Sequence, residues 1–295
     1  MLKIDKILCP MDFSEFSVKA YEYAQSLAKH YGAKLYVEHV VQSLTANYPY
    51  FSFPEAMSDI YFDLSEKAES ELKELVKTHT LDGIQPEFVV ERGPVPDGIL
   101  SFSEKQSVDL IVMGTHGRQG VDHLTMGSVA EKVLRKARCP VLAVRRPAHD
   151  FVVSGRAEKD PVQLHRILFC HDFSAHSDRA LTYAVSLAME YGAELTLLHV
   201  LEDFPHIENL EQETEKLIRK IEEPIPAEAR QWCTVKSVVR VGKPYQEIIQ
   251  LALESHTDLA IMGVRGRSSL DLALFGSTTH RVLQLGPCPV LAVHI

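Results

Sequence analysis

A glycine-containing pattern that occurs twice is the part of this sequence whose residue types and spacing could do chemistry. Gly114-Thr115-His116-Gly117 is followed nine residues later by Gly127-Ser128, and the same spacing leads from Gly263 and Gly266 to Gly276-Ser277. Glycine lets the backbone approach a ligand closely, and the N–H groups at the start of a helix favour an anion. The pattern therefore predicts two sites that hold phosphate oxygens on backbone N–H groups.

Each of these residues also has a purely structural interpretation. Gly114 and Gly117 can be turn glycines that join a strand to a helix, and Ser128 and Ser277 can be helix caps. A phosphate contact is compatible with capping, so both interpretations stay open. The occurrence of the full pattern in two places favours phosphate binding.

The whole chain is an internal duplication, which defines its domains. Residues 7–40 align with residues 167–200, with 18 of 34 positions identical, and residues 109–144 align with residues 258–293, with 17 of 36 identical. A chain of 295 residues is also typical of about two domains. We predict a first domain at 1–146, a linker at 147–164 and a second domain at 165–295.

Apolar periodicity alternates between strand and helix within each copy. In the first copy we expect strands at 4–10, 35–41, 85–91, 109–113 and 141–144, and helices at 18–31, 54–80, 95–106 and 129–137. This alternation predicts an α/β fold with two doubly wound, five-stranded parallel sheets. Ligands bind such sheets at the carboxyl ends of the strands, which is where Asp12 and Gly114 are expected.

Composition restricts the class of protein. The net charge of −9 argues against a nucleic-acid-binding surface, and no apolar run reaches the ~20 residues that span a bilayer. The amino-terminal residues are too few and too charged for a signal peptide. Five scattered cysteines fit a reducing compartment better than a disulfide framework. We therefore expect a cytoplasmic protein that binds neither nucleic acid nor membrane.

Catalytic motifs are not found in the sequence. It has no G-x-x-x-x-G-K-[ST] loop, no G-x-G-x-x-G fingerprint and no G-x-S-x-G elbow. Its 14 histidines show no zinc-binding spacing, so we predict no metal site. An enzymatic role is not favoured beyond slow hydrolysis of a bound nucleotide.

Three features in constant order resemble the universal stress protein family, and they occur twice. They are an aspartate after the first strand (Asp12, Asp172), the pattern G-x-x-G-x₉-G-S, and C-P-V-L-A-V at 139–144 and 288–293. The resemblance covers nearly all of the chain and implies a tandem member. It also implies a Rossmann-like fold of the adenine-nucleotide alpha-hydrolase type that binds ATP, with or without Mg²⁺.

The resemblance assigns roles to individual positions. It implies that Asp12 lies beside the nucleoside, that Val40 flanks the adenine, and that the glycines with Ser128 hold the phosphates. The implied residues of the second site are Asp172, Val200, Gly263, Gly266, Gly276 and Ser277. His171 stands where the first copy has Met11, directly before the aspartate, and we expect it to make the second nucleoside pocket different from the first.

The implied function is a stress-response sensor or regulator whose conformation depends on the nucleotide and is read by an unidentified protein partner. The alternatives are a nucleotide-free interaction or small-molecule-binding scaffold, with helices 55–79 and 207–222 holding the ligand, and a slow ATP hydrolase. Fifth strands of the family pair across a two-fold axis. We therefore expect 141–144 to pair with 290–293 as an intramolecular pseudo-dimer, and a homodimer of such chains is a further expectation.

Overall fold

The computed structural model describes residues 2–42, 54–116, 126–145, 147–148, 150–152, 162–202, 209–264 and 276–294, with the backbone alone at 54–62. The first half contains β1 (Lys6–Pro10), α1 (Glu15–Tyr31), β2 (Lys34–Gln42), α2 (Pro54–His79), β3 (Glu87–Gly93), α3 (Val95–Gln106), β4 (Leu110–Gly114), α4 (Ser128–Lys136) and β5 (Val141–Val144). The second half contains β6 (Arg166–Cys170), α5 (Ala175–Tyr191), β7 (Glu194–Leu201), α6 (Leu210–Glu222), α7 (Ala229–Trp232), β8 (Thr234–Val241), α8 (Pro244–Glu254), β9 (Leu259–Gly263), α9 (Ser277–Leu285) and β10 (Val290–Val293). The predicted alternation of strands and helices is confirmed, and the four-residue α7 is an addition that the pattern did not indicate.

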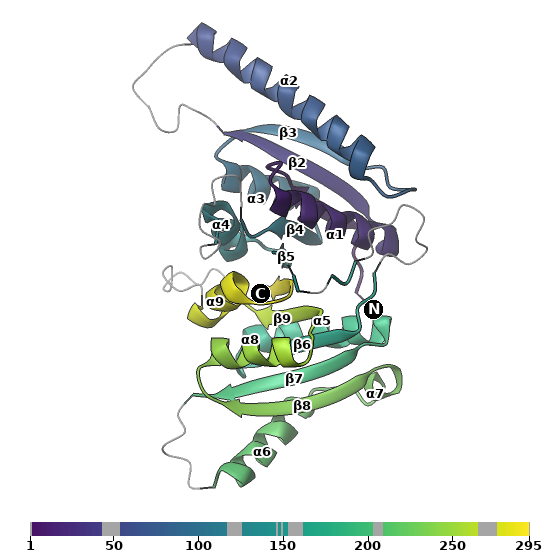
Figure 1. The fold of residues 1–295 in the computed structure, drawn as a ribbon, viewed down its shortest axis with the longest axis vertical. Helices are drawn as coiled ribbons and strands as arrows, with labels where there is room; N and C mark the ends of the chain where they lie inside the picture. Colours follow the sequence, from purple (N-terminus) through teal and green to yellow (C-terminus); the bar gives the residue numbers. More distant parts are fainter. Residues whose placement is uncertain are drawn as a thin grey trace.

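The two predicted sheets join into one ten-stranded sheet with the order β3-β2-β1-β4-β5-β10-β9-β6-β7-β8. Strands within each half are parallel, and β5 pairs with β10 in the antiparallel direction. The intrachain pairing expected for these two strands is therefore present. The molecule is elongated as a result, with α2 at one end and α6 at the other (Figure 1).

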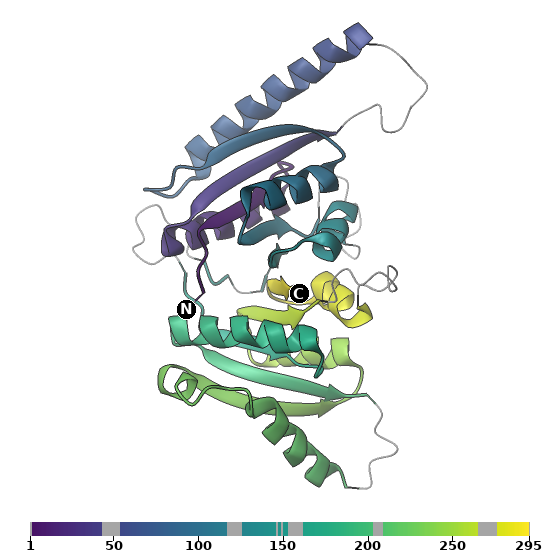
Figure 2. The same ribbon diagram turned by 180° about the vertical axis from the view of Figure 1, so that it is seen from behind.

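Two apolar layers cover the two faces of the sheet. One layer packs α1 and α5 against residues such as Val37 and Phe169, and the other packs α3, α4, α8 and α9 against residues such as Tyr36 and Leu168. Each layer contains buried residues from both halves, so the hydrophobic core continues across the β5–β10 seam. Figure 2 shows the same stacking of the two halves from behind.

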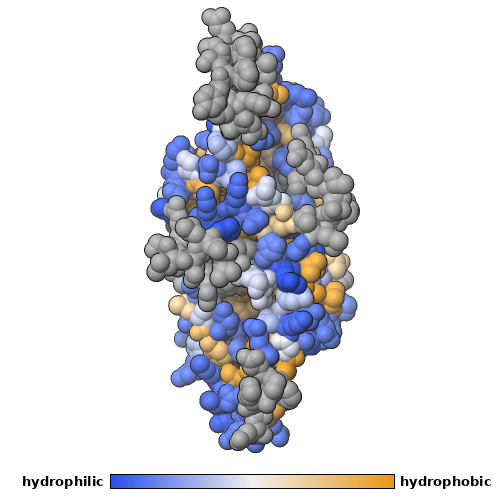
Figure 3. Space-filling view, turned by 90° about the vertical axis from the view of Figure 1, so that its left-hand side faces the viewer, coloured by the Kyte–Doolittle hydropathy of each residue, from blue (hydrophilic) through white to orange (hydrophobic). Residues whose placement is uncertain are grey.

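Among the described helices, none combines the length and apolar character that crossing a membrane requires. All five cysteines are free thiols. Among the coloured residues of Figure 3, hydrophilic side chains dominate and hydrophobic ones lie in separate groups.

Candidate functional site

A cavity of about 670 Å³ opens at the carboxyl edge of the first half. Its volume lies within the range of about 300–1,000 Å³ that is usual for small-molecule sites. The cavity lies between the ends of β1, β2 and β4 and the starts of α3 and α4. Five predicted site residues line it together, namely Asp12, Val40, Gly114, Gly127 and Ser128. Gly117 lies outside the described residues.

Asp12 is held in a tight turn after β1. Its Oδ1 accepts hydrogen bonds from the backbone N–H of Ser14 at 3.0 Å and from the Ser14 hydroxyl at 2.6 Å. Phe13 between them has φ of 62°, in the left-handed region that is rare for a large side chain. Ser14, whose side chain accepts from the N–H of Ser17, is the N-cap of α1. Asp12 therefore does not cap α1 itself, and its carboxylate is fixed at the rim of the cavity.

The start of α4 forms the opposite wall. Gly127 is the N-cap, and its N–H donates to the carbonyl of Thr115 at 2.8 Å. Ser128 is the first helical residue and makes no capping hydrogen bond, so the interpretation of Ser128 as a cap is wrong. In the second half Gly276 caps α9 in the same way, and Ser277 follows it. The first N–H groups of a helix have no acceptor inside the helix, which makes this wall suitable for an anion.

The glycines of the pattern fall into two groups, of which only one is required by close packing. A Cβ on Gly114 would lie 2.8 Å from the backbone carbon of Phe16, and one on Gly263 would lie 2.5 Å from that of His176. These two glycines therefore allow a helix to pack closely on a strand. A Cβ on Gly276 would meet, among the described residues, only the hydroxyl of Thr279 at 3.9 Å. Gly127 and Gly276 have negative φ values, so their backbone conformation does not demand glycine either.

Val40 supplies an apolar wall of the cavity. It is buried, and a Cβ on Gly98 of α3 would lie 3.0 Å from Val40 Cγ2, so glycine allows α3 to approach β2 here. The second half differs, because Val200 is only partly buried. The residue at the position of Gly98 is Glu247, whose carboxylate lies 3.6 Å from the guanidinium of Arg240.

Glu38 is a cavity residue that the sequence interpretation missed. It is 1% exposed, and neither carboxylate oxygen has a hydrogen-bond partner among the described residues. Burial, with a further contribution from the Glu91 carboxylate, raises the pKa of Glu38 to about 8. The available signal was a glutamate in the middle of an otherwise apolar strand, at a position where the second copy has Leu198.

The described site residues of the second half follow the same order along the chain, but Asp172 and Val200 are less buried than Asp12 and Val40. Asp172 accepts from the N–H of Ser174 at 3.0 Å and is exposed. Gly263 is the last residue of β9, Gly276 caps α9 and Ser277 is its first residue. Gly266 lies outside the described residues.

His171, the residue before Asp172, is buried in the second half, and its expected effect on the second nucleoside pocket stays a prediction. Its side chain is buried among Phe169, Phe173 and α5, with Nε2 3.1 Å from Asp178 Oδ1. Burial lowers the pKa of His171, although the Asp178 carboxylate acts in the opposite direction. The histidine thus occupies the position of Met11, which is buried in the first half and also lines the cavity there.

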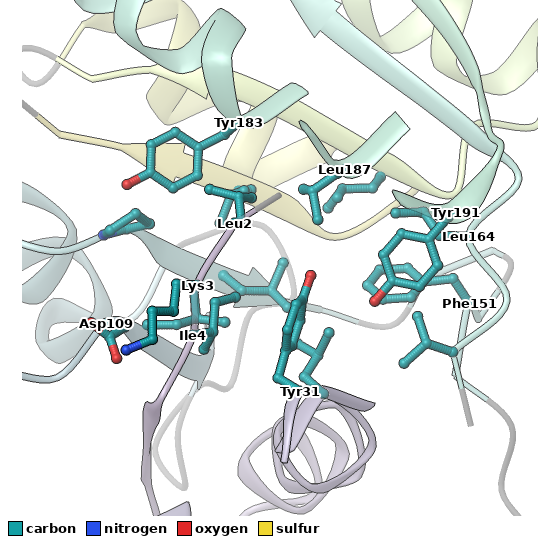
Figure 4. A pocket seen from close by; sticks show the side chains of 17 residues that line it. Leu2, Lys3, Ile4, Tyr31, Asp109, Phe151, Leu164, Tyr183, Leu187 and Tyr191 are labelled. Atoms are coloured by element: carbon teal, nitrogen blue, oxygen red, sulfur yellow. The ribbon is translucent and has the colours of Figure 1, made fainter. Parts of the chain in front are cut away.

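A second cavity of about 120 Å³ lies at the seam between the two halves. Its lining is mainly apolar and comes from α1, α5, the amino-terminal segment and the connection between the halves. Figure 4 shows the side chains of Tyr31 and Tyr191 directed into this space from α1 and α5. None of the predicted site residues that the structure describes lines it. In the described part of the chain, no group of three or more His, Cys, Asp or Glu side chains is arranged to hold a metal ion.

Comparisons with known proteins agree with this architecture. The family model described as the universal stress protein family matches residues 3–145 and 163–294. A universal stress protein of Methanocaldococcus jannaschii is 36% identical over 147 residues, which cover 48% of this chain and 82% of that protein. One from Mycobacterium tuberculosis is 26% identical over 267 residues, or 87% of this chain and 86% of that protein. The crystal structure of a universal stress protein from Archaeoglobus fulgidus is similar with a TM-score of 0.74 and 26% identity, over 99% of both chains. The chain therefore belongs to the universal stress protein family, as a tandem member in which the family's domain occurs twice.

Proposed function

We propose that this chain binds an adenine nucleotide, ATP, at the carboxyl edge of its sheet and regulates a stress response through nucleotide-dependent conformation. The observation that carries the proposal is the combination of a fixed carboxylate, an apolar wall and a helix start around one cavity. These three features match the ribose, the base and the phosphates of a nucleotide.

Each part of the nucleotide has a proposed partner. Asp12 accepts hydrogen bonds from the ribose hydroxyls, and Val40 packs against the base. The N–H groups at the start of α4 and the hydroxyl of Ser128 hold the phosphates, and Lys132, which also lines the cavity, adds positive charge. Gly114 and Gly127 also line the cavity, and Gly117 belongs to the same proposed loop.

The second site is proposed on the equivalent residues, which are Asp172, Val200, Gly263, Gly266, Gly276 and Ser277. Mg²⁺ is normally held by phosphate oxygens, water and only one or two carboxylates, so the nucleotide would bring most of its ligands. The proposal also includes Mg²⁺, a protein partner that binds the nucleotide-bound conformation, and a homodimer.

The test uses substitutions that the helices tolerate. Aspartate is a favoured N-cap residue and its charge suits a helix start, so Gly127→Asp and Gly276→Asp are expected to fold normally. The same charge repels a phosphate, and we expect each substitution to weaken ATP binding at its own site by about a hundredfold or more. Gly127→Ser and Gly276→Ser are the neutral controls and are expected to bind ATP.

Calorimetry with ATP, together with the nucleotide released on denaturing the purified chain, gives the result. Two binding events, each removed by its own aspartate, support the proposal. No binding by the wild-type chain, or unchanged binding by both aspartate variants, overturns it in favour of the scaffold role. Release of phosphate that both aspartate variants abolish would identify a slow hydrolase instead.

A further inference from the structure

We propose that Glu38 is a specificity-determining residue of the first site, whose carboxyl group pairs with the 6-amino edge of an adenine base. The inference rests on the proposed nucleotide function and assigns to the first site a contact that the second site lacks.

The position of Glu38 places it close to the residues proposed to hold the nucleoside. On β2 its side chain is two residues from Val40 and so shares a face of the sheet with it, and the neighbouring residue on β1 is Pro10, two positions before Asp12. Glu38 lines the same cavity as Val40 and Asp12. Its two oxygens are buried without a hydrogen-bond partner among the described residues. A buried polar group left without a partner costs stability, and a ligand that supplies the partners removes this cost.

The second copy shows that the fold does not need a carboxyl group here. Leu198 pairs with Cys170 as Glu38 pairs with Pro10, so the two side chains occupy equivalent places beside β6 and β1. Leu198 is 1% exposed and packs in the apolar layer with Val282 and Leu283. An apolar residue is therefore accommodated at this position, and the glutamate must be explained by something other than packing.

The hydrogen-bonding capacity of the acid form fits adenine. Because burial raises the pKa of Glu38 to about 8, the group is mainly the neutral acid at pH 7, with one O–H donor and one carbonyl acceptor. The 6-amino group of adenine donates and the adjacent ring nitrogen accepts, the same pair of groups that asparagine or glutamine reads on adenine. The proposed contact is therefore O–H to the ring nitrogen and N–H to the carbonyl oxygen.

The charged surroundings of Glu38 set its pH dependence. Glu91 on β3 is the carboxylate that acts on it, in the direction that favours the acid form. The other titratable residues that line the cavity in the described part of the chain are Asp12, His39, His116 and Lys132, and α3 contributes only uncharged lining residues. When Glu38 loses its proton, it has no O–H to donate, and its negative carboxylate repels the lone pair of the ring nitrogen. ATP binding at the first site should therefore weaken as the pH rises through about 8.

The test compares ATP with purine riboside 5′-triphosphate, which lacks the 6-amino group, in a Gly276→Asp background that isolates the first site. With Glu38 present we expect ATP to bind about tenfold more tightly than the analogue, the worth of one hydrogen bond. Glu38→Gln keeps a donor and an acceptor, so it should retain this preference and lose the pH dependence. Glu38→Leu, which copies the second half, should fold and lose the preference.

The outcomes separate this inference from the proposed function. ATP binding by Glu38→Leu with unchanged affinity and unchanged preference over the analogue overturns the role of Glu38 and leaves the nucleotide function intact. A pH dependence in Glu38→Gln equal to that of the glutamate-containing chain also overturns it. No binding of either triphosphate to the wild-type chain overturns the nucleotide function, and this inference with it.

Discussion

Leu142 and Leu291, which are equivalent positions of the two copies, face each other in the middle of the antiparallel β5–β10 pair. A pseudo-two-fold axis therefore passes between them. His30 of α1 and Glu190 of α5 are also equivalent positions, and they meet across the same seam with Nε2 and Oε1 2.9 Å apart. In a pairing of two identical first halves residue 30 would face its own copy. The copies have diverged into a complementary pair, which favours association of the two different halves of one chain.

Because His30 and Glu190 are complementary, we expect that replacing one of them destabilises the chain and that exchanging the two restores its stability. His30→Glu would place two carboxylates together beside Glu190, whose side chain is 5% exposed, and should lower the free energy of unfolding by about 2 kcal/mol. The exchange His30→Glu with Glu190→His restores one histidine and one glutamate and should recover most of the loss. Urea unfolding of the three chains measures both effects. Equal stability of the single and exchanged variants would show that the pair does not specify the seam.

The two kinds of glycine in the repeated pattern should respond differently to substitution. Gly114→Ala would bring a methyl group within 2.8 Å of the Phe16 backbone, and backbone cannot move aside as a side chain can. We expect a loss of about 1–3 kcal/mol in the free energy of unfolding, the range for overpacking. Gly276→Ser, whose Cβ would meet only Thr279 at 3.9 Å among the described residues, should stay within about 0.5 kcal/mol of the wild type. If thermal melting shows the same loss for both, close packing does not explain Gly114.

Most of the fold could be predicted from the sequence because the two copies repeat the same periodicity. The helix stop at Gly32 is observed with φ of 63°, as a C-terminal glycine predicts. The short α7 was not predicted because four residues carry too little periodicity. That the hydrophobic layers continue from one half to the other was also not predicted, because residues such as Val37 and Phe169 give no sign of which partner they will meet.

The site was predictable in its outline and less so in its chemistry. The resemblance implied that Asp12, Val40, Gly127 and Ser128 would come together, and they line one cavity. The interpretation of Ser128 as a cap named the neighbour of the observed cap, Gly127, because a polar side chain beside a helix start has several backbone N–H donors within one or two residues. Glu38 was missed because burial of a charge inside a strand is a three-dimensional property.

His294 makes the seam sensitive to acid. The side chain is 2% exposed, Nε2 contacts the carbonyl of Leu134 at the end of α4, and burial lowers the pKa of His294. Below pH 6.5, the ordinary pKa of histidine, His294 takes up a proton in the unfolded chain more readily than in the folded chain. The stability associated with His294 is therefore present above pH 6.5 and is lost as the pH falls below it.

His294→Gln, which keeps a donor without titrating, provides the comparison. Between pH 7 and pH 5 the wild-type chain should lose unfolding free energy relative to this variant, by roughly 1.4 kcal/mol for each pH unit within the window. Denaturant unfolding at a series of pH values measures the difference. Parallel pH profiles of the two chains would exclude His294 as the titrating group.

For Glu38 we expect the opposite pH dependence of the free energy of unfolding, over a range that extends to higher pH. Its folded pKa of about 8 lies above its ordinary value of 4.5, so between these values the folded chain keeps a proton that the unfolded chain has released. Stability should therefore fall as the pH rises from 4.5 to 8 and level off above, with a loss of roughly 3 kcal/mol between pH 5 and pH 8 relative to Glu38→Gln. Glu38→Leu should be more stable than the wild type at pH 7, because it removes an unpartnered buried carboxyl group. If Glu38→Leu is more stable than the wild type but binds ATP less tightly, the glutamate is kept at the expense of stability. If the unfolding free energies of the wild type and Glu38→Gln depend on pH in the same way, the carboxyl group is not buried as described.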